Sequence, residues 1–502
     1  MKKYDVCVIG GGPSGYAAAM RALDFNKKVL LIEKDKIGGA GLYNGALSSK
    51  TFWELSKDIE SARSRTKRYM NCELHVSYKD VLFDVNEALV NRKNILEGQI
   101  TKLQSLEGEN FDYIKGTGKL LSKNEINIVL KDGKEEVVFA EYIILATGSR
   151  PRKLAHIPVD EKHIVTSDGI EHFDDFPKSM VIMGAGVIGC EWATIFSNFG
   201  FTKVNIIDKA DRVLPFEDND ITAKIEENMI QRGVNVHRNS QLVRMEVKNG
   251  MVEYELQYKD GHNEVFTVEK ALVSVGRVVN VEGIGLEDVG VELLENGTVK
   301  NDDSQTTVPN IYAVGDLTAD ISLVNVGEME GRHAIEKIYG DGKHELDYRN
   351  ISTIMFLNPE TAGVGINEKE AQKNKMSYRV VTIDYGIIPR AVAMKNANGF
   401  FKIIVSNDDE MKILGMRAIG VHASSAIQAV ALLIHMDKGI EELTELIHPH
   451  PSIIEGIQEA LRAFKGKSIL KPEVFKDMLK CKVCDENACY TDWSWLSNAK
   501  VK

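Results

Sequence analysis

The apolar and polar positions near the start of the chain predict a strand, a tight turn, a helix and a second strand. Residues 4–9 form the first apolar run, residues 10–15 read GGGPSG, and an alanine-rich helical stretch follows. Residues 28–32, which read KVLLI, predict a second strand that ends at Glu33. A glycine-rich turn between a buried strand and a helix is typical of a β-α-β unit that binds a dinucleotide.

The same pattern occurs a second time in the middle of the chain. Residues 180–183 predict a strand, residues 184–189 read GAGVIG, a helix runs to Asn198, and residues 204–207 predict another strand that ends at Asp208. Two units of this kind predict two bound dinucleotides.

Further helices and strands follow from the same patterns elsewhere. Helical periodicity runs through residues 53–62 and 85–106, and a β-rich stretch leads to residues 142–148, which read YIILATG. Residues 400–405 also predict a strand. The mixture of helices and strands around two dinucleotide units indicates an α/β protein.

The residues of the first glycine turn have separate physical tasks. Gly10 permits the tight turn, Gly12 lets backbone N–H groups approach a pyrophosphate, and Gly15 lets the helix pack closely on the strand. Glu33 can accept hydrogen bonds from a ribose diol. Strand, glycines, helix and acid in this order predict a dinucleotide site more strongly than the glycines alone.

The acid of the second unit indicates which nicotinamide dinucleotide is bound. A carboxylate at Asp208 accepts from ribose hydroxyls and repels a 2′-phosphate, which favours NAD over NADP. Lys209 and Arg212 follow closely and weaken this preference, because basic side chains accommodate a 2′-phosphate.

Composition excludes several classes of function. The chain has 502 residues, of which 43% are hydrophobic and 27% charged, and a formal net charge of −11. This is ordinary material for several domains, and the negative charge argues against a nucleic-acid or anionic-membrane partner. Residues 1–5 do not resemble a signal peptide and no apolar run could span a bilayer, so we expect a cytoplasmic protein.

The segment at residues 38–50 reads GGAGLYNGALSSK and carries the main resemblance to a known family. It resembles the redox-active segment of class I pyridine nucleotide-disulfide oxidoreductases, dihydrolipoamide dehydrogenase and its relatives, whose pattern is GGTCLNVGCIPSK. The two cysteine positions of that pattern are Gly41 and Ala46 here. Without sulfur at either position, we expect no dithiol chemistry at this place.

Other segments extend the resemblance to about residues 3–465. They are the ATG run that ends at Gly148, the residues 275–277, the residues 307–316 that read TVPNIYAVGD, and the residues 355–365 and 448–455. The resemblance implies two Rossmann-like dinucleotide-binding domains, as in glutathione reductase, and an α+β C-terminal dimerisation domain. The implied division is an FAD-binding domain of residues 1–150 and 276–345, an NAD-binding domain of residues 151–275, a dimerisation domain of residues 346–466 and a cysteine-containing tail of residues 467–502.

The resemblance also implies the roles of individual residues. Lys50 and Glu191 match the family's ion pair beside the flavin, a pair that suits hydride transfer. His450 and Glu455 match its acid-base pair, which is supplied from the partner subunit of a homodimer; here the pair either protonates an acceptor or is inherited scaffolding. The implied cofactors are FAD and NAD(H), and the positions expected to bind them are Gly10, Gly12, Pro13, Ser14, Gly15, Glu33, Lys34, Gly39, Lys50, Gly118, Thr147, Gly148, Gly184, Gly186, Ile188, Gly189, Asp208, Gly276, Arg277, Gly315 and Asp316.

Three of the six cysteines are close together near the C-terminus. Cys481 and Cys484 form a C-x-x-C pair that could cycle as a dithiol, and Cys489 follows. The three could also hold a metal, but a tetrahedral site needs a fourth ligand and no nearby His offers one, so no metal site is predicted. The aromatic residues Tyr490, Trp493 and Trp495 fit a tail that docks on a protein partner.

These observations predict an FAD-dependent NAD(P)H oxidoreductase that passes hydride from NADH to the flavin and then directly to a small-molecule acceptor. Three alternatives remain open. The first is a soluble pyridine nucleotide transhydrogenase, and the second is a disulfide or persulfide reductase that uses the tail cysteines. The third is a non-catalytic flavoprotein subunit of a larger complex.

Overall fold

The computed structural model describes residues 1–43, 45–70, 73–319, 321–341, 343, 345–486 and 488–491. The chain forms two compact units, and each unit draws on two separate stretches of sequence. The first unit comprises Met1–Pro177 and Leu272–Leu346, and the second comprises Lys178–Ala271 and the chain from Asp347 onward. Within the described ranges, no helix combines the length and the apolar composition that crossing a membrane requires.

The first unit is built around an eight-stranded sheet in the order β1-β2-β3-β4-β5-β18-β17-β16, in which β1 also pairs with β5. Strands β1, β2, β3, β5 and β18 are parallel where they pair with one another, and β4 runs antiparallel to β3 and β5. Its elements are β1 (Lys3–Ile9), α1 (Pro13–Asp24), β2 (Val29–Glu33), α2 (Gly39–Leu42), α3 (Ala46–Tyr69), α4 (Tyr78–Leu106), β3 (Phe111–Leu120), β4 (Glu125–Leu130), β5 (Glu135–Leu145), β6 (Ser149–Pro151), β7 (Ile164–Val165), β15 (Arg277–Val279), α7 (Leu286–Val289), β16 (Asn301–Asp302), β17 (Gln305–Thr306), β18 (Ile311–Ala313) and α8 (Val324–Tyr339).

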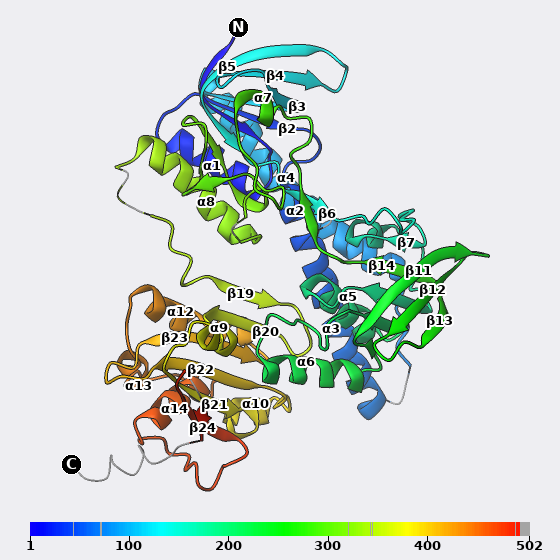
Figure 1. Ribbon diagram of the computed structural model, residues 1–502, viewed down its shortest axis with the longest axis vertical. Helices are drawn as coiled ribbons and strands as arrows, with labels where there is room; N and C mark the ends of the chain where they lie inside the picture. Colours follow the sequence, from blue (N-terminus) through cyan, green and yellow to red (C-terminus); the bar gives the residue numbers. More distant parts are fainter. Residues whose placement is uncertain are drawn as a thin grey trace. The chain divides into compact units, whose positions relative to one another are not determined.

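Glycines bring the first helix of this unit close to its neighbours. Helix α8 runs beside α1 (Figure 1), and a Cβ at Gly331 of α8 would lie 2.2 Å from the carbonyl oxygen of Ser14. The apolar strands β1, β2 and β5 lie at the centre of this unit, where Val6, Leu30 and Ile144 are fully buried. The close packing fixes the start of α1 at the carboxyl end of β1.

The second unit contains a parallel sheet in the order β10-β9-β8, an antiparallel sheet of β11, β12 and β13, and a seven-stranded antiparallel sheet in the order β19-β20-β23-β22-β21-β24-β25. The boundary between the units falls inside β14 (Lys270–Val273). The other elements are β8 (Ser179–Met183), α5 (Val187–Phe199), β9 (Lys203–Ile207), α6 (Asn219–Gln231), β10 (Asn235–His237), β11 (Ser240–Lys248), β12 (Met251–Tyr258), β13 (Asn263–Val268), β19 (Ser352–Met355), β20 (Thr361–Gly365), α9 (Glu368–Lys373), β21 (Tyr378–Asp384), α10 (Pro389–Ala393), β22 (Phe400–Ser406), β23 (Ile413–Ile419), α11 (Ala423–Ala426), α12 (Gln428–His435), α13 (Glu441–Thr444), α14 (Glu455–Phe464), β24 (Leu479–Cys484) and β25 (Cys489–Tyr490).

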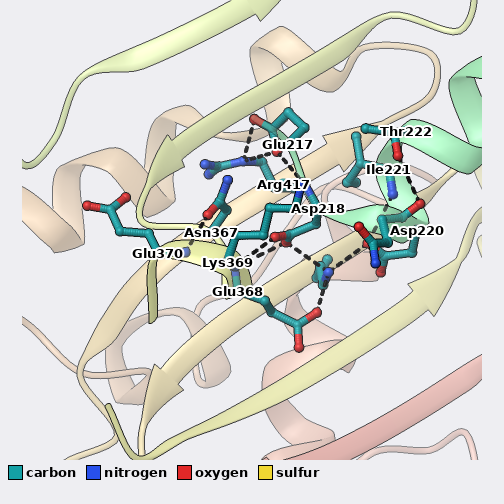
Figure 2. A network of polar contacts seen from close by, with 12 residues as sticks. Glu217, Asp218, Asp220, Ile221, Thr222, Asn367, Glu368, Lys369, Glu370 and Arg417 are labelled. Atoms are coloured by element: carbon teal, nitrogen blue, oxygen red, sulfur yellow. Dashed lines mark hydrogen bonds and ion pairs between the residues drawn. The ribbon is translucent and has the colours of Figure 1, made fainter. Parts of the chain in front are cut away.

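A buried ion network joins the two stretches of chain that form the second unit (Figure 2). Lys402 of β22 contacts Asp218 at 2.9 Å, Asp220 at 2.7 Å and also Glu368. Its side chain is only 1% exposed. Asp218 also accepts hydrogen bonds from the backbone N–H groups of Glu368 (3.2 Å) and Lys369 (3.1 Å), so it caps α9. A buried ammonium needs such partners.

The elements expected from the sequence are largely confirmed. The two Rossmann-like folds and the C-terminal α+β fold are present, and the helices expected at residues 53–62 and 85–106 are longer, as α3 and α4. The C-terminal residues differ from expectation: β24 pairs with β21 along its whole length and is a strand of the seven-stranded sheet. Trp493 and Trp495, expected to dock on a partner, lie outside the described residues.

Candidate functional site

The glycine turn of the first unit has room only for glycine at two of its positions. Gly10 has a φ of +112°, and a Cβ there would lie 2.2 Å from the carbonyl oxygen of Ala146. A Cβ at Gly15 would lie 1.9 Å from the carbonyl oxygen of Gly10. The turn is therefore wedged between β1, β5 and α1, which confirms the packing roles expected of these two glycines.

Gly12 differs from these two glycines because the space beside it is open. It is the N-cap of α1, and among the described residues nothing lies within 4 Å of a Cβ built on it. Pro13 takes the first helical position, and the first turn contains no acidic residue. The free N–H groups and the helix dipole at this end attract an anion, so the cradle fits the pyrophosphate of FAD.

Each unit holds the acid that is expected to bind ribose in the same way. Glu33 accepts hydrogen bonds from the backbone N–H groups of Gly11 (2.7 Å) and of Asp35, two residues further on (2.7 Å). Asp208 accepts from Ala185 (2.7 Å) and again from the residue two positions further on (2.8 Å). A carboxylate has about four acceptor sites, so each acid keeps capacity for a ribose diol.

The second glycine turn repeats the open cradle of the first. Gly184 has a φ of +103°, and Gly186 caps α5 with nothing within 4 Å of its Cβ position in the described part of the chain. Ile188 and Gly189 follow in the first turn of α5. A cleft of about 580 Å³ is lined mainly by α6, together with Asp211, Arg212 and Arg238. The open cradle at Gly186 lies at the carboxyl end of β8, the edge at which dinucleotides bind to such sheets, which fits NAD(H).

The later motifs of the first unit converge on the carboxyl ends of its strands. Asp316 accepts a hydrogen bond from the Ser149 hydroxyl (2.6 Å), and Arg277 donates to the same hydroxyl (2.7 Å). The Thr147 hydroxyl donates to the carbonyl of Asn280 at 2.7 Å. Gly148, Gly276 and Gly315 all have positive φ, so these turns require glycine. The structure therefore brings Thr147, Gly148, Arg277 and Asp316 together within the first unit.

Three other predicted cofactor positions have simpler surroundings. Gly39 approaches the first turn, because a Cβ on it would lie 3.1 Å from the Cα of Gly12. Gly118 lies in β3, where a Cβ would be 3.3 Å from the side chains of both Ile9 and Ile32, so its printed contacts are packing contacts. Lys34 is exposed directly after β2. Their cofactor roles stay predictions.

The segment at residues 38–50 contains the end of α2 and the start of α3. Helix α2 ends at Leu42, and α3 begins at Ala46. A Cβ at Gly41 would lie 2.3 Å from Cγ of Pro13, closer than side chains approach one another. Lys50 belongs to the first unit and has its Nζ 3.3 Å from the Ser49 hydroxyl. Glu191 belongs to the second unit, is buried, and accepts a hydrogen bond from the Phe356 backbone at 3.0 Å. The pairing expected between Lys50 and Glu191 stays a prediction.

The expected acid-base pair is assembled at the start of α14. Nδ1 of His450 lies 2.8 Å from Oε1 of Glu455, and the other carboxylate oxygen accepts from the Ser452 backbone at 2.7 Å. Burial acts to raise the pKa of Glu455, but the Ser452 N–H and His450 outweigh it, so the pKa is lowered. The His450 side chain is 69% exposed. A carboxylate at Nδ1 favours the tautomer that leaves Nε2 as the base.

A carboxyl that the sequence did not single out lies close to the redox-segment motif. Burial raises the pKa of Glu171, against the opposing effects of the Ser48 hydroxyl and His172. Ser48 is buried and stands between Ala46 and Lys50 in α3. No motif surrounds Glu171 in the sequence. Its signal is burial, which exists only in the folded chain.

The tail cysteines pair differently from the C-x-x-C dithiol that the sequence left open. Cys484 forms a disulfide with Cys489, and Cys481 is a free, fully buried thiol. Cys481 packs in the larger apolar cluster of the C-terminal fold and Cys484 in a separate smaller one. Alternate side chains of a strand point to opposite faces, and positions 481 and 484 differ by an odd number of residues. The Cys481–Cys484 dithiol that the sequence left open is therefore not formed, and the three cysteines do not converge on one metal.

Comparison with known proteins agrees with this architecture. Residues 4–331 match the family described as pyridine nucleotide-disulphide oxidoreductase, and residues 351–461 match its dimerisation domain. A dihydrolipoyl dehydrogenase of Bacillus subtilis is 32% identical over 478 residues, which cover 93% of this chain and 99% of that protein. A leghemoglobin reductase of Glycine max is 30% identical over 468 residues, with 92% and 88% covered.

Solved structures show the same fold. The crystal structure of LpdA from Mycobacterium tuberculosis superposes with a TM-score of 0.82 at 26% identity, and covers 92% of this chain and 99% of that one. A flavoprotein disulfide reductase of Escherichia coli, induced by HOCl and solved as a Cu(II) complex, gives a TM-score of 0.81 at 24% identity over 92% and 99% of the two chains.

Proposed function

Because the chain belongs to the pyridine nucleotide-disulphide oxidoreductase family, whose members are FAD- and NAD(P)-dependent, we propose that it is an NADH oxidoreductase without a dithiol beside the flavin. NADH bound by the second unit supplies hydride, bound FAD relays the two electrons, and a small-molecule acceptor takes them directly. The proposal includes a homodimer, supported by the match to the dimerisation domain, and a cytoplasmic location.

The observation that carries the proposal is the chemistry of residues 38–50. Gly41 and Ala46 have no sulfur, and the sequence has no cysteine between Cys7 and Cys72. The backbone at Gly41 also opposes a side chain, since a Cβ would meet Pro13 at 2.3 Å. Thiolate chemistry needs a sulfur at the reacting place, so the electrons must leave by another route.

Binding of NADH rather than NADPH is supported by the surroundings of Asp208. Its carboxylate ends the second strand of the dinucleotide unit, the position that accepts hydrogen bonds from ribose hydroxyls in such units, and it would repel a 2′-phosphate. Of the two basic residues that follow Asp208, Lys209 is exposed, and the guanidinium of Arg212 contacts Asp211 at 3.1 Å and also Asn219. This commitment of Arg212 argues against a transhydrogenase, which has to bind both nicotinamides.

Proton transfer to the acceptor is assigned to His450 in this proposal. Its Nδ1 is held by Glu455 and its ring is exposed, so the other ring nitrogen can give a proton to an acceptor such as a quinone. Lys50 and Glu191 are assigned to the nicotinamide side, where a positive charge favours hydride delivery.

The test is an anaerobic titration of the purified FAD-loaded protein with NADH, which counts electrons taken up per FAD. We expect the flavin absorbance to bleach with two electrons and without a thiolate charge-transfer band. The matched control is the variant with Cys484→Ser and Cys489→Ser, which should titrate identically. Uptake of four electrons by the wild type and two by this control would instead show a disulfide reductase that uses the Cys484–Cys489 pair.

Turnover with candidate acceptors completes the test. We expect the protein to oxidise NADH with small quinones as acceptors. We expect no reduction of NAD by dihydrolipoamide. Steady turnover of dihydrolipoamide would refute the reasoning from Gly41 and Ala46. An unbleached flavin at excess NADH, with FAD and NADH both bound, would leave the non-catalytic subunit as the correct function.

A further inference from the structure

The hairpin at the end of the described chain places two sulfurs at the edge of the seven-stranded sheet. β24 and β25 pair so that Cys484 is opposite Cys489, and the two form a disulfide. Cys484 is fully buried, whereas Cys489 is exposed. The ladder between β24 and β21 holds the strand along its whole length, so the strand keeps its place when the disulfide is open.

A carboxylate from a distant part of the sequence reaches the same place. Glu368 is the first residue of α9 and is 8% exposed. One of its carboxylate oxygens and the two sulfurs all lie within 4.8 Å of one another. Zinc binds sulfur at about 2.3 Å and oxygen at about 2.0–2.2 Å in a tetrahedron, which separates ligand atoms by roughly 3.5–3.8 Å. Reduction of the disulfide would let the two sulfurs separate to this spacing, and the Glu368 carboxylate already lies within reach of both.

The charges around Glu368 favour a further cation. Asp218, Asp220 and Glu368 share the single ammonium of Lys402. Lys482 is the other cation near Glu368, at 4.0 Å, and its side chain is 42% exposed and can turn to water. The ammonium of Lys369 donates to the Pro215 carbonyl at 2.6 Å and is engaged there. Three carboxylates facing one ammonium leave an excess of negative charge, which a divalent ion would offset.

The neighbouring group of three carboxylates does not offer a second metal site of this kind. The ligand atoms of Asp218, Asp220 and Glu368 also cluster, but Lys402 already contacts all three. Glu368 has two carboxylate oxygens, so it can keep Lys402 on one and bind a metal through the other. The hairpin site therefore differs from the ion network in its two sulfur ligands.

We propose that Cys484, Cys489 and Glu368 form a zinc site when the disulfide is reduced, with the fourth position open to water on the exposed side of Cys489. Two cysteines with four residues between them are a common ligand spacing for zinc, and a site with three protein ligands keeps one position for water. The two states of the hairpin, disulfide and zinc dithiolate, exclude each other.

The change between the two states balances with an external dithiol as the reductant. The dithiol gives two electrons and two protons, so its own disulfide forms while the Cys484–Cys489 bond breaks. Zinc then displaces the two thiol protons, which pass to solvent, and both sulfurs bind as thiolates. An external disulfide reverses the change by thiol–disulfide exchange: it takes two electrons from the thiolates and two protons from solvent to become a dithiol, the Cys484–Cys489 bond forms again, and the ion is released.

The test uses the full-length FAD-loaded protein, reduced with a phosphine, freed of it anaerobically and incubated with zinc before gel filtration and elemental analysis. We expect the reduced wild type to retain about one zinc per chain, as for a single tetrahedral site, and the disulfide form to retain none. Cobalt substitution should give the d–d bands of a tetrahedral thiolate site, beyond the flavin absorbance.

Cys489→Ser is the decisive variant because Cys489 is exposed and its replacement leaves the core intact. We expect it to weaken zinc binding by at least about tenfold, since even indirect ligand contacts have effects of that size. Cys481→Ala is the matched control, because it removes a tail cysteine from the other cluster and should bind zinc like the wild type. Glu368→Gln should bind zinc more weakly than the control does. The proposal is overturned if the reduced wild type takes up no zinc, or if Cys489→Ser retains as much as Cys481→Ala.

Discussion

Replacement of Lys402 by Met tests how much the buried ion network contributes to stability. The side chains are similar in length, but Met has no charge. In the wild type, the ammonium of Lys402 is 1% exposed, and its partners Asp218 and Glu368 are 3% and 10% exposed on their side chains. Asp220, the third partner, is 41% exposed and can be solvated by water.

The expected loss follows from this burial. Removing one partner of a buried ion pair leaves an uncompensated charge and costs about 3–5 kcal/mol in the free energy of unfolding. Asp220 adds little, because an exposed pair contributes at most about 1 kcal/mol. The matched control is Lys412→Met, whose pair with Asp437 has side chains 38% and 64% exposed, so its loss should stay below about 1 kcal/mol.

The pH dependence of the loss checks its cause. Burial acts to raise the pKa of Asp218, but Lys402 and the backbone N–H groups of α9 outweigh it, so the wild-type pKa is lowered. Burial acts to lower the pKa of Lys402, and its three carboxylates raise it overall. The stabilisation is therefore present above the unfolded pKa of Asp, near 3.9, and below that of Lys, near 10.4.

Urea unfolding of wild type, Lys402→Met and Lys412→Met, followed by far-UV circular dichroism, gives the comparison. Without the ammonium, burial raises the pKa of Asp218, so the carboxyl takes up a proton as the pH falls. The deficit of Lys402→Met should therefore be largest near pH 7 and shrink towards pH 5. Equal losses in both variants, or a deficit that does not change with pH, would refute the reasoning.

Three other predictions follow from the glycine turns and from Glu171. Gly12→Val should abolish FAD retention after purification, and Gly186→Val should keep FAD but weaken NADH binding at least about tenfold, or ~1.4 kcal/mol. The reason is that each new side chain would enter a cradle that is open among the described residues. Loss of FAD from Gly186→Val would contradict this assignment. Gly41→Ala should lower the free energy of unfolding, measured in urea, by about 1–3 kcal/mol, because the new Cβ would lie 2.3 Å from Cγ of Pro13. Gly98→Ala is the control: nothing described lies within 4 Å of its Cβ position, so the change should stabilise α4 by up to about 1 kcal/mol. Since burial raises the pKa of Glu171, the wild-type free energy of unfolding should fall as the pH rises from about 4.3 through the folded pKa. Glu171→Gln should remove that fall in a pH series of melts. If the free energy of unfolding of the variant depended on pH as steeply as that of the wild type, the burial of the Glu171 charge would be contradicted.

Much of the two dinucleotide sites could be predicted because they depend on local sequence. Gly10, Gly15 and Glu33 are fixed by a strand, a turn and a helix that follow one another along the chain, and Asp208 repeats the arrangement. The pairing of Cys484 with Cys489 could not be predicted, because C-x-x-C spacing does not reveal which face of a strand each sulfur occupies. The strand itself was missed because β24 has its partner, β21, far away in the sequence.

The sequence by itself determined that two dinucleotides can bind and that residues 38–50 carry no cysteine, because helix periodicity, glycine turns and residue identity are local properties. The tertiary structure decided which charges and sulfurs meet. Lys402 contacts Asp218, and Glu368 lies close to Cys484, only because α6, α9, β22 and β24 pack together. The physical reason is that burial and non-local contacts set the energies of charged groups, and neither exists until the chain has folded.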